Sequence, residues 1–599
     1  MSRGWVCNRS LIAASMLLLG TPALALDVDL QGALSEELRT DIEGGSLLIE
    51  QSTAETEMTP QELVSIAQAD YKRILAVLYD YGYYGAVIGI KLDGREASSI
   101  KSVSPPSSVS RADISITPGN QFRFGTAEVG PLAPGTTLPE GFRSGETAKL
   151  SLLRDTVSAT TNAWRDRGHA KAKLESQRLT ARHAEGTLNA TLRLDPGPRL
   201  RFGDLKVAGN SAVRTERILE IAGLPTGTVY SPDELQDAAN RLRRTGTFSS
   251  VAMIEAEEVG PGDELGITAR VADDKPRRFG FGGEISTIEG LSLSAFWVHR
   301  NLFGGAERLR VEAEIEGIGG DTGGTDFLLG ARYQRPATFN EDTDLYILGE
   351  VEQQDEINFF SRQATIGAGI ERIASDKRTY RLGVALRRAN TRDAFGDDQY
   401  TLFMVPAGTT FDYRDRILDA RKGYYLNADL TPFYALQGAD NGLLTSVDAR
   451  VYRTIGDVRT TTFALRGQLG SVLGPSLSDA PADFLFYSGG GDTVRGHDYQ
   501  SLGVDVGGGQ IVGGRSFLGL SAEVRFRSAG SLGYVGFFDA GYIGDESFPD
   551  GSGEWQSGAG VGLRYDTPIG PIRLDVAVPT SGDDDGSSFQ VYIGIGQAF

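Results

Sequence analysis

The sequence ITPGNQFRFGTAEVG (residues 116–130) decides the fold because its pattern returns later in the chain. In it a Pro-Gly turn leads into an alternating strand with a Phe-Gly pair, and LDPGPRLRFGDLKVAGN (residues 194–210) repeats this arrangement. The two pairs begin at Phe124 and Phe202, 78 residues apart, and a third pair begins 77 residues later at Phe279. A repeat of this length indicates a series of small modules. After the third pair, Gly-rich amphipathic strands continue to the last residue, so we expect a modular N-terminal half and a barrel-like C-terminal half.

Length and charge narrow the class of protein. A chain of 599 residues is expected to form several domains. It carries 59 Lys and Arg against 79 Asp and Glu, a net charge of −20. This balance excludes the basic surface typical of nucleic-acid binding and favours a well-solvated surface.

Residues 1–25 have the pattern of a secretory signal peptide. Arg3 and Arg9 provide the positive start, LIAASMLLLG is the apolar stretch, and Ala23-Leu24-Ala25 offers a small-x-small cleavage site. The single cysteine, Cys7, precedes the apolar stretch. We therefore expect an exported chain that contains no disulfide.

The C-terminal half, residues 276–599, has the pattern of a membrane barrel. No apolar run after the predicted signal is long enough for a membrane-spanning helix, and a closed barrel is the other structure that satisfies every backbone group in lipid. Alternating stretches recur about every 20 residues, which predicts roughly sixteen antiparallel strands. In the last strand the residues predicted to face lipid are Phe589, Val591, Ile593, Ile595 and Phe599.

The N-terminal half divides into residues 26–118, 119–198 and 199–275. We expect each module to be strand, helix, helix, strand, strand. In the third module, Ser231 and Glu234 have the spacing of a capping box, and Gly246 follows the helix as a stop. Thr59 and Glu62 repeat the capping box in the first module, whereas the middle module retains only an equivalent helix end near Gly168.

This arrangement resembles polypeptide-transport-associated (POTRA) domains. The resemblance rests on GYYGAVI, GHAKAKL and GTFSSVAM, which follow the expected second helices. Such modules expose an edge strand that can bind an extended peptide by β-augmentation. The alternative is that the modules act only as a rigid spacer.

The C-terminal motifs are similar to those of the bacterial outer-membrane assembly-factor superfamily, the surface-antigen type that combines POTRA modules with a barrel. They are FDYRDRILDARKGYYLNADLTPF (residues 411–433), FYSGGGDTVRGHDYQSLG (residues 486–503), GVGLRYDTPIGPIRLDVAVP (residues 560–579) and the closing GIGQAF. The second contains Val494-Arg495-Gly496, which matches the VRG(F/Y) motif of the family's long sixth loop, with His497 where an aromatic residue is usual.

The resemblance implies a fold of three α+β POTRA repeats followed by a transmembrane barrel of about sixteen strands. Three modules are similar to the translocation-and-assembly-module (TamA) branch. That branch implies an insertase for autotransporters and other barrel proteins in outer-membrane lipid, with a periplasm-spanning TamB-like partner. A two-partner secretion channel is the nearest alternative, and a passive porin or anchor is an alternative of another class.

The resemblance implies one site, and the glycines in the first and last strands suggest a second. The first is a loop latch in which Arg495 and Gly496 meet Glu523 and Asp539, at positions that contact this arginine in relatives. Its alternative is static architecture. The second is a lateral gate between the first strand, residues 278–286, and the last strand. The predicted gate residues are Gly280, Gly282, Gly283, Gly594, Gly596 and Phe599, and the alternative is that these glycines serve tight packing in the lumen.

Nothing in the sequence points to an enzyme. The four histidines, at positions 169, 183, 299 and 497, show no metal-ligand spacing, and there is no HExxH, CxxC, GxSxG or phosphate-binding loop. The acidic run at residues 583–585 lacks the alternate spacing of a calcium loop and is expected to be a hairpin tip. We therefore expect no metal or cofactor.

Overall fold

The structure is a computed structural model that describes residues 26–52, 58–101, 103–286, 290–320, 323–456, 460–527, 530–567, 570–582, 589–595, 597 and 599. The predicted signal peptide, Gly596 and the acidic run at 583–585 lie outside the described residues. The chain forms two compact units, of which the second contains Phe202–Thr226, Asp233–Gly260 and Leu265–Phe599. Each unit is described by itself.

The first module is a four-stranded sheet covered by helices. Its sheet has the order β1-β4-β2-β3, in which β4 pairs in parallel with β1 and antiparallel with β2. Its elements are β1 (Asp27–Gln31), α1 (Glu36–Gly45), α2 (Leu47–Ser52), α3 (Pro60–Asp80), β2 (Val87–Leu92), β3 (Arg95–Glu96), the short 3-10 helix η1 (Ala97–Ser99) and β4 (Arg111–Thr117).

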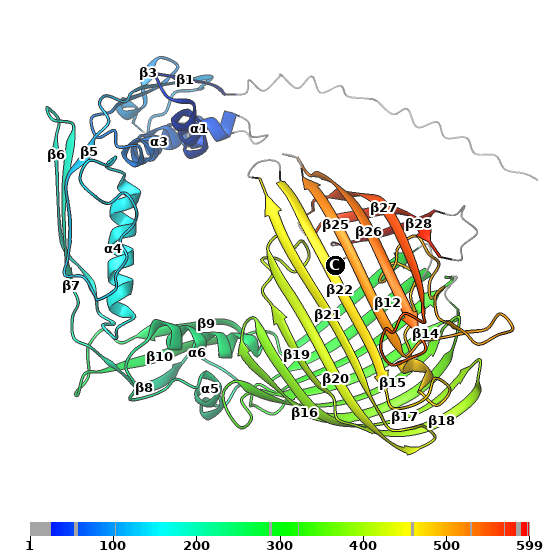
Figure 1. The fold of residues 1–599 in the computed structure, drawn as a ribbon. Coiled ribbons are helices and arrows are strands. Elements are labelled where there is room, and N and C mark those ends of the chain that lie inside the picture. Colours follow the sequence, from blue (N-terminus) through cyan, green and yellow to red (C-terminus); the bar gives the residue numbers. More distant parts are fainter. Residues whose placement is uncertain are drawn as a thin grey trace, which may run out of the picture. The chain divides into compact units, whose positions relative to one another are not determined.

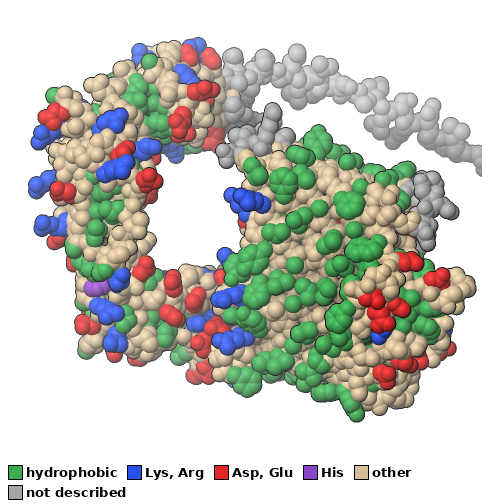
Figure 2. Space-filling model, viewed as in Figure 1, with side chains coloured by type: hydrophobic (Ala, Val, Ile, Leu, Met, Phe, Trp, Pro, Cys, Tyr) green, Lys and Arg blue, Asp and Glu red, His purple; other side chains and the backbone are tan. Residues whose placement is uncertain are grey.

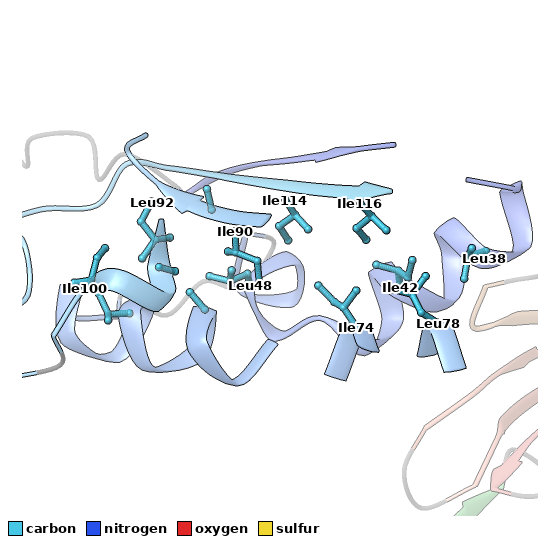
Figure 3. Packing of buried hydrophobic residues seen from close by; sticks show 14 residues of the cluster. Leu38, Ile42, Leu48, Ile74, Leu78, Ile90, Leu92, Ile100, Ile114 and Ile116 are labelled. Carbon is cyan, nitrogen blue, oxygen red and sulfur yellow. The ribbon is translucent and has the colours of Figure 1, made fainter. Parts of the chain in front are cut away.

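The core of this module lies between the helices and one face of the sheet (Figure 3). Ile90 and Ile114 point from the sheet toward Ile74 of α3 and Leu48 of α2, and all four are fully buried. The predicted capping box begins α3: Glu62 N donates to Thr59 Oγ1, and Thr59 N donates to Glu62 Oε2 at 2.8 Å. The apolar spacing of α3 and its cap together fix this helix against the sheet.

The second sheet has the order β5-β7-β6, with elements β5 (Arg123–Gly130), α4 (Leu150–Arg165), β6 (Lys173–Arg182) and β7 (Thr187–Asp195). The expectation of two helices in every module is wrong: the described residues show one helix here and three α-helices in the first module. Between β5 and α4 the chain contains three prolines and, at Gly135, Gly141 and Gly145, glycines with positive φ. This composition breaks helical hydrogen bonding, so an irregular segment replaces the first helix.

The third module has the predicted order of strand, helix, helix, strand, strand. Its elements are β8 (Arg201–Ala208), α5 (Thr215–Ala222), α6 (Pro232–Arg244), β9 (Phe248–Glu255) and β10 (Glu264–Asp273). Gly223 follows α5 with φ 56°, and Gly246 follows α6 with φ 66°, the left-handed conformation that ends helices. The sheet order is β8-β10-β9, so in all three small sheets the last strand of the chain segment has neighbours on both sides.

The C-terminal half forms a seventeen-stranded sheet in consecutive order (Figure 1). Its strands are β11 (Arg277–Ser286), β12 (Gly290–Arg300), β13 (Arg308–Ile318), β14 (Asp326–Arg335), β15 (Thr343–Asp355), β16 (Phe360–Ser375), β17 (Arg378–Asp393), β18 (Gly396–Met404), β19 (Ala407–Asp412), β20 (Gly423–Gln437), β21 (Gly442–Ile455), β22 (Thr460–Leu473), β25 (Ser516–Arg527), β26 (Leu532–Gly544), β27 (Glu554–Tyr565), β28 (Ile572–Ser581) and β29 (Gln590–Ile595). Both β18 and β19 pair with β17 and with β20, so they are two parts of one crossing interrupted at Pro406. The prediction of about sixteen crossings is therefore confirmed.

Residues alternate between the two faces of this sheet. Figure 2 shows hydrophobic side chains across the outer face of the wall that contains β20–β22, β25 and β26. Leu465 and Phe538 are about half exposed on that face, whereas their strand neighbours Ala464 and Phe537 are buried on the inner face. Among the described residues, no helix has the length and apolarity to cross a membrane.

The last strand follows the predicted parity only as far as β29. Phe589 and Ile593 are exposed on the outer face, and Tyr592 is buried on the inner face. The lipid-facing prediction for Phe599 is wrong: its ring is buried with Tyr452 and Ala464, on the inner face. The physical reason is contacts beyond β29: Gln597 N donates to the Leu418 carbonyl oxygen at 3.2 Å, and Arg525 Nη2 donates to the Phe599 carbonyl oxygen at 2.9 Å.

Candidate functional site

The long loop between β22 and β25, residues 474–515, places a buried arginine against the inner wall of the barrel. The Arg495 side chain is 3% exposed. Its Nε donates to Asp539 Oδ2 at 2.7 Å, its Nη2 to Asp539 Oδ1 at 3.0 Å, and its Nη1 to Glu523 Oε1 at 2.8 Å. The guanidinium also lies 3.6 Å from the centre of the Phe537 ring. The structure thus brings together Arg495, Glu523 and Asp539 as the sequence predicted.

Three further charged residues complete this network, and the sequence analysis missed them. Asp575 of β28 accepts from Arg495 Nη1 at 3.3 Å and is also paired with Arg564. Glu523 accepts from Arg525 Nε at 2.8 Å. Three arginines therefore balance three carboxylates, which is how charges persist away from water. The alternation of Glu523 and Arg525 on β25 was the one available signal, since it places both on one face.

Glycines let the loop lie flat on the wall. A Cβ at Gly558 of β27 would come within 1.9 Å of the Arg495 carbonyl oxygen, and a Cβ at Gly560 within 2.3 Å of the Phe537 ring. Gly496 has φ 101°, and a Cβ there would meet the Val578 backbone at 2.7 Å. Arg495 can therefore reach its partners only because these positions have no side chain.

The same loop is bonded to the last strand. Gly496 N donates to the Tyr592 hydroxyl oxygen at 3.0 Å, and Gln590 Nε2 donates to Asp498 Oδ1 at 2.7 Å. His497, at the position where relatives have an aromatic residue, donates from Nε2 to the Ser557 carbonyl oxygen at 2.9 Å. The loop thus contacts β27 and β29 as well as β25, β26 and β28.

A second buried ion pair holds the loop against β17, near the middle of the strand order. Arg387 Nη2 of β17 lies 2.6 Å from Asp483 Oδ2 in the short helix η2 (Ala482–Phe484), and the two side chains are 15% and 1% exposed. That contact is close enough for charge attraction, although it is not aligned as a hydrogen bond. The Tyr400 hydroxyl of β18 donates to Asp483 Oδ1. The loop is therefore held both near the last strands and near the middle of the sheet.

The first and last strands of the sheet meet at a seam. Among the described residues the sheet begins at β11 and ends at β29, and no backbone ladder pairs these two strands, although they contact each other. On β11, Gly280 and Gly282 face the lumen: a Cβ would meet the Phe296 ring at 2.2 Å and Ser294 Oγ at 2.5 Å. Gly283 lies on the outer face near Leu293.

The remaining predicted gate residues lie on the other side of the seam. A Cβ at Gly594 of β29 would meet Arg573 Nε at 2.9 Å. Gly596 is outside the described residues, and Phe599 is buried in the lumen, where Arg525 Nη2 donates to its carbonyl oxygen at 2.9 Å. At Gly280 the close ring supports the packing alternative, and the other positions leave both interpretations open.

Comparison with known families identifies the fold. The Omp85 superfamily domain matches residues 301–599, and the POTRA family, described as surface antigen variable number repeat, matches residues 200–272. The chain belongs to the Omp85 superfamily. The POTRA match coincides with the third small sheet, and the barrel match begins after β12.

Individual relatives of this Omp85 chain are distant. The outer membrane protein assembly factor BamA of Nitratidesulfovibrio vulgaris is 24% identical over 73% of this chain and 56% of its own length. The chloroplastic outer envelope protein 80 of Arabidopsis thaliana is 23% identical over 90% of this chain and 74% of its own. The crystal structure of Haemophilus ducreyi BamA lacking POTRA domains 1–3 superposes with a TM-score of 0.62 at 16% identity, covering 80% of this chain and 99% of that chain.

The chain thus spans little more than half the length of the BamA sequence that it matches. The family assignment makes it a bacterial outer-membrane protein whose POTRA module lies in the periplasm. It also agrees with the expectation that the chain is not an enzyme.

Proposed function

We propose that this Omp85 protein inserts other β-barrel polypeptides into the outer membrane through the seam between β11 and β29. The observation that supports this most is the lack of a ladder between those strands in the described residues. Unpaired backbone groups in lipid cost several kcal/mol each. A client strand that bonded to β11 or β29 would satisfy them one for one, so insertion at the seam needs no covalent chemistry.

The finer form of the proposal is a TamA-like factor with three POTRA modules at residues 26–118, 119–198 and 199–275. Its clients are unfolded autotransporters or other barrel proteins, and its partner is a periplasm-spanning TamB-like protein. Three small sheets precede the barrel, which favours this form over a two-partner secretion channel with two modules. The exposed edge strand β6 offers a backbone edge for an extended peptide.

Within this function, the loop at 474–515 acts as a latch. Arg495 and Gly496 hold it against Glu523, Asp539 and the last strand. We assign to it the role of setting the position of β29, and hence the width of the seam. A merely static role would leave assembly unaffected when the loop is loosened in a barrel that still folds.

Cysteine crosslinking tests the seam. Cys7 is the only natural cysteine, so a background without cysteine is simple to make. Because Gly282 faces the lumen, its partner must be an inward position of β29, and Gly594 is one, since Tyr592 two residues earlier is buried on the inner face. The expected result is that an oxidised Gly282→Cys, Gly594→Cys pair stops client assembly and that reduction restores it. Gly280→Cys replaces Gly282→Cys if the first pair does not oxidise.

The matched control locks a neighbouring pair of strands. Gly282 and Ser294 are ladder partners on β11 and β12, so Gly282→Cys with Ser294→Cys closes a bond within the first hairpin and leaves the seam free. This control is expected to assemble clients normally. Full assembly by an oxidised seam pair would refute the gate. Large, steady single-channel conductance, with an unchanged outer-membrane proteome when the gene is deleted, would favour the passive porin.

A further inference from the structure

Two barrel turns form a seat for the third module. The first, residues 301–307, joins β12 to β13, and the second, residues 336–342, joins β14 to β15. Arg214 N, at the start of α5, donates to the Gly304 carbonyl oxygen of the first turn at 2.9 Å. The buried Arg217 of α5 donates from Nη2 to the Pro336 carbonyl oxygen of the second turn at 2.6 Å.

Two arginines of α6 complete the joint. Arg241 forms a bidentate pair with Asp342: Nε donates to Oδ1 at 3.0 Å, and Nη2 donates to Oδ2 at 3.1 Å. Its Nη1 donates to the Ala222 carbonyl oxygen at the end of α5, so one side chain connects both helices to the barrel. Arg244 donates to Asp342 Oδ1 at 3.1 Å. Bidentate arginine–carboxylate pairs are both strong and geometrically specific. Arg241 is buried, whereas the Asp342 side chain is 28% exposed, so the pair lies at the edge of the solvent.

The backbone of the seat is strained. Seven non-glycine residues have positive φ in the described chain, and four of them lie in these two turns: Asn301, Ala306, Ala337 and Phe339. Such conformations persist only where the surroundings over-determine them. The internal bonds of the first turn, where Glu307 accepts from Gly305 N at 2.9 Å and Phe303 N at 3.1 Å, show one part of that constraint.

The seat and the loop hold opposite sides of the seam. The seat turns belong to β12–β15, which follow the first strand β11. The loop at 474–515 is bonded through Arg495, Gly496 and His497 to β25–β29, on the side of the last strand. It also reaches the turn after β15, where Asn358 Nδ2 donates to the Gln500 carbonyl oxygen at 3.1 Å. The third module therefore contacts turns on the first-strand side of the seam, whereas the buried Arg495 of the loop is bonded to strands on the last-strand side.

We propose that Arg241, Arg244 and Asp342 are positioning residues that make the third module and the β12–β15 wall one rigid body, so that a load applied to the module moves the first-strand side of the seam. This inference rests on the proposed function, because the seam is its gate. In this inference the module has two roles: it binds peptides, and it transmits a mechanical load from a molecule bound to the periplasmic half to the first-strand side of the seam.

Distance measurements on spin-labelled protein test the joint without any client. In the cysteine-free background, labels are attached to Ser250→Cys on β9 and Ile417→Cys in the exposed turn between β19 and β20. We expect one narrow distance distribution in the full chain. Arg241→Ala and Asp342→Ala are each expected to broaden it, and the double variant to broaden it no more than either single one, because both remove the same contact.

A matched control lies on the same helix. Arg243 is exposed and bonds within the module, donating to the Val251 carbonyl oxygen at 3.0 Å. Arg243→Ala should leave both the distance distribution and client assembly unchanged. Arg241→Lys, which retains the charge but not the two-sided grip, is expected to fall between the wild type and Arg241→Ala.

Client assembly then tests the transmission. Arg241→Ala is expected to lower the assembly rate at least about fivefold in a barrel whose heat-modifiability is unchanged. An unchanged distance distribution in both Arg241→Ala and Asp342→Ala would overturn the joint. A broadened distribution with full assembly would overturn the transmission and leave the proposed function intact. If the wild-type protein assembles no client, the proposed function fails, and with it the transmission, while the distance measurement still decides the joint.

Discussion

Replacing Arg495 with alanine should undock the loop from the barrel wall. The three carboxylates around the guanidinium do not lose the same share of their hydrogen bonds and charge partners. Glu523 retains its bond from Arg525, and Asp575 retains Arg564. Asp539 accepts from the Arg495 side chain at 2.7 and 3.0 Å and from its backbone N at 3.3 Å, and no other bond to it is found in the described residues. The variant therefore leaves one buried carboxylate, 1% exposed, without its counter-charge.

The loss of Asp539's counter-charge sets the free-energy cost of the Arg495→Ala substitution. Breaking a buried ion pair from one side costs about 3–5 kcal/mol, most of it from the stranded charge. At about 1.4 kcal/mol per tenfold, the ratio of docked to undocked loop falls roughly a hundredfold to a few thousandfold. Removing the stranded charge reverses part of the loss, so Asp539→Asn added to Arg495→Ala should recover about 1–3 kcal/mol.

Urea denaturation in detergent measures this difference. Unfolding is followed by the loss of heat-modifiability on cold gels for the wild type, Arg495→Ala, Asp539→Asn and the double variant. The double variant is expected to be more stable than Arg495→Ala alone. A loss below about 1 kcal/mol, as for an exposed pair, or a double variant that is less stable than Arg495→Ala, would refute the reasoning.

Two further predictions concern single residues. Gly558→Ala should displace the loop, because the new Cβ would lie 1.9 Å from the Arg495 carbonyl oxygen. Gly536→Ala is the control and should have little effect, because no atom lies within 4 Å of a Cβ at that position. Protease cleavage of the loop at 474–515 should be faster in Gly558→Ala, and equal cleavage in both variants would contradict the glycine argument. Hydrogen bonds from the Thr59 backbone and side chain lower the pKa of Glu62. A lowered pKa in the folded state means that the capping box contributes stability above the ordinary pKa of a glutamate and loses it as the pH falls through the lowered value. The protection factors of amides at the start of α3, which correct for the slower intrinsic exchange at low pH, should therefore fall on acidification in the wild type but not in Glu62→Gln, and identical pH profiles would refute this.

Much of the barrel could be predicted from the sequence because membrane strands alternate with period two. The parity of β29 is confirmed at Phe589, Tyr592 and Ile593. It fails at Phe599, because the residues after β29 are placed by contacts such as that of Gln597 with Leu418 in a distant turn, which periodicity does not report. The capping box at the start of α3 was predictable because its contacts are local.

The sequence predicts a site residue that lies in a recognisable motif. It does not predict a residue whose position depends on the register of strand pairing. Arg495 stands in a recognisable motif, and the resemblance supplied Glu523 and Asp539. Asp575 joins them only because β28 lies two strands from β26, so its face and height depend on the pairing of the whole C-terminal wall. The grip of Arg241 on Asp342 was equally hidden, since it joins residues 101 positions apart in two different domains.

The three glycines on the inner face of β27 have a consequence for the order in which the barrel forms. Gly558, Gly560 and Gly562 each leave room for an atom from elsewhere: a loop carbonyl, the Phe537 ring and the Asp575 carboxylate. At these three positions β27 contributes no side chain to the lumen and its neighbours fill the space, whereas Gln556 and Arg564 are buried at the two ends of the same face. We therefore expect the loop to pack against β27 before the last strands pair, because a barrel that closed first would enclose an unfilled cavity beside these glycines.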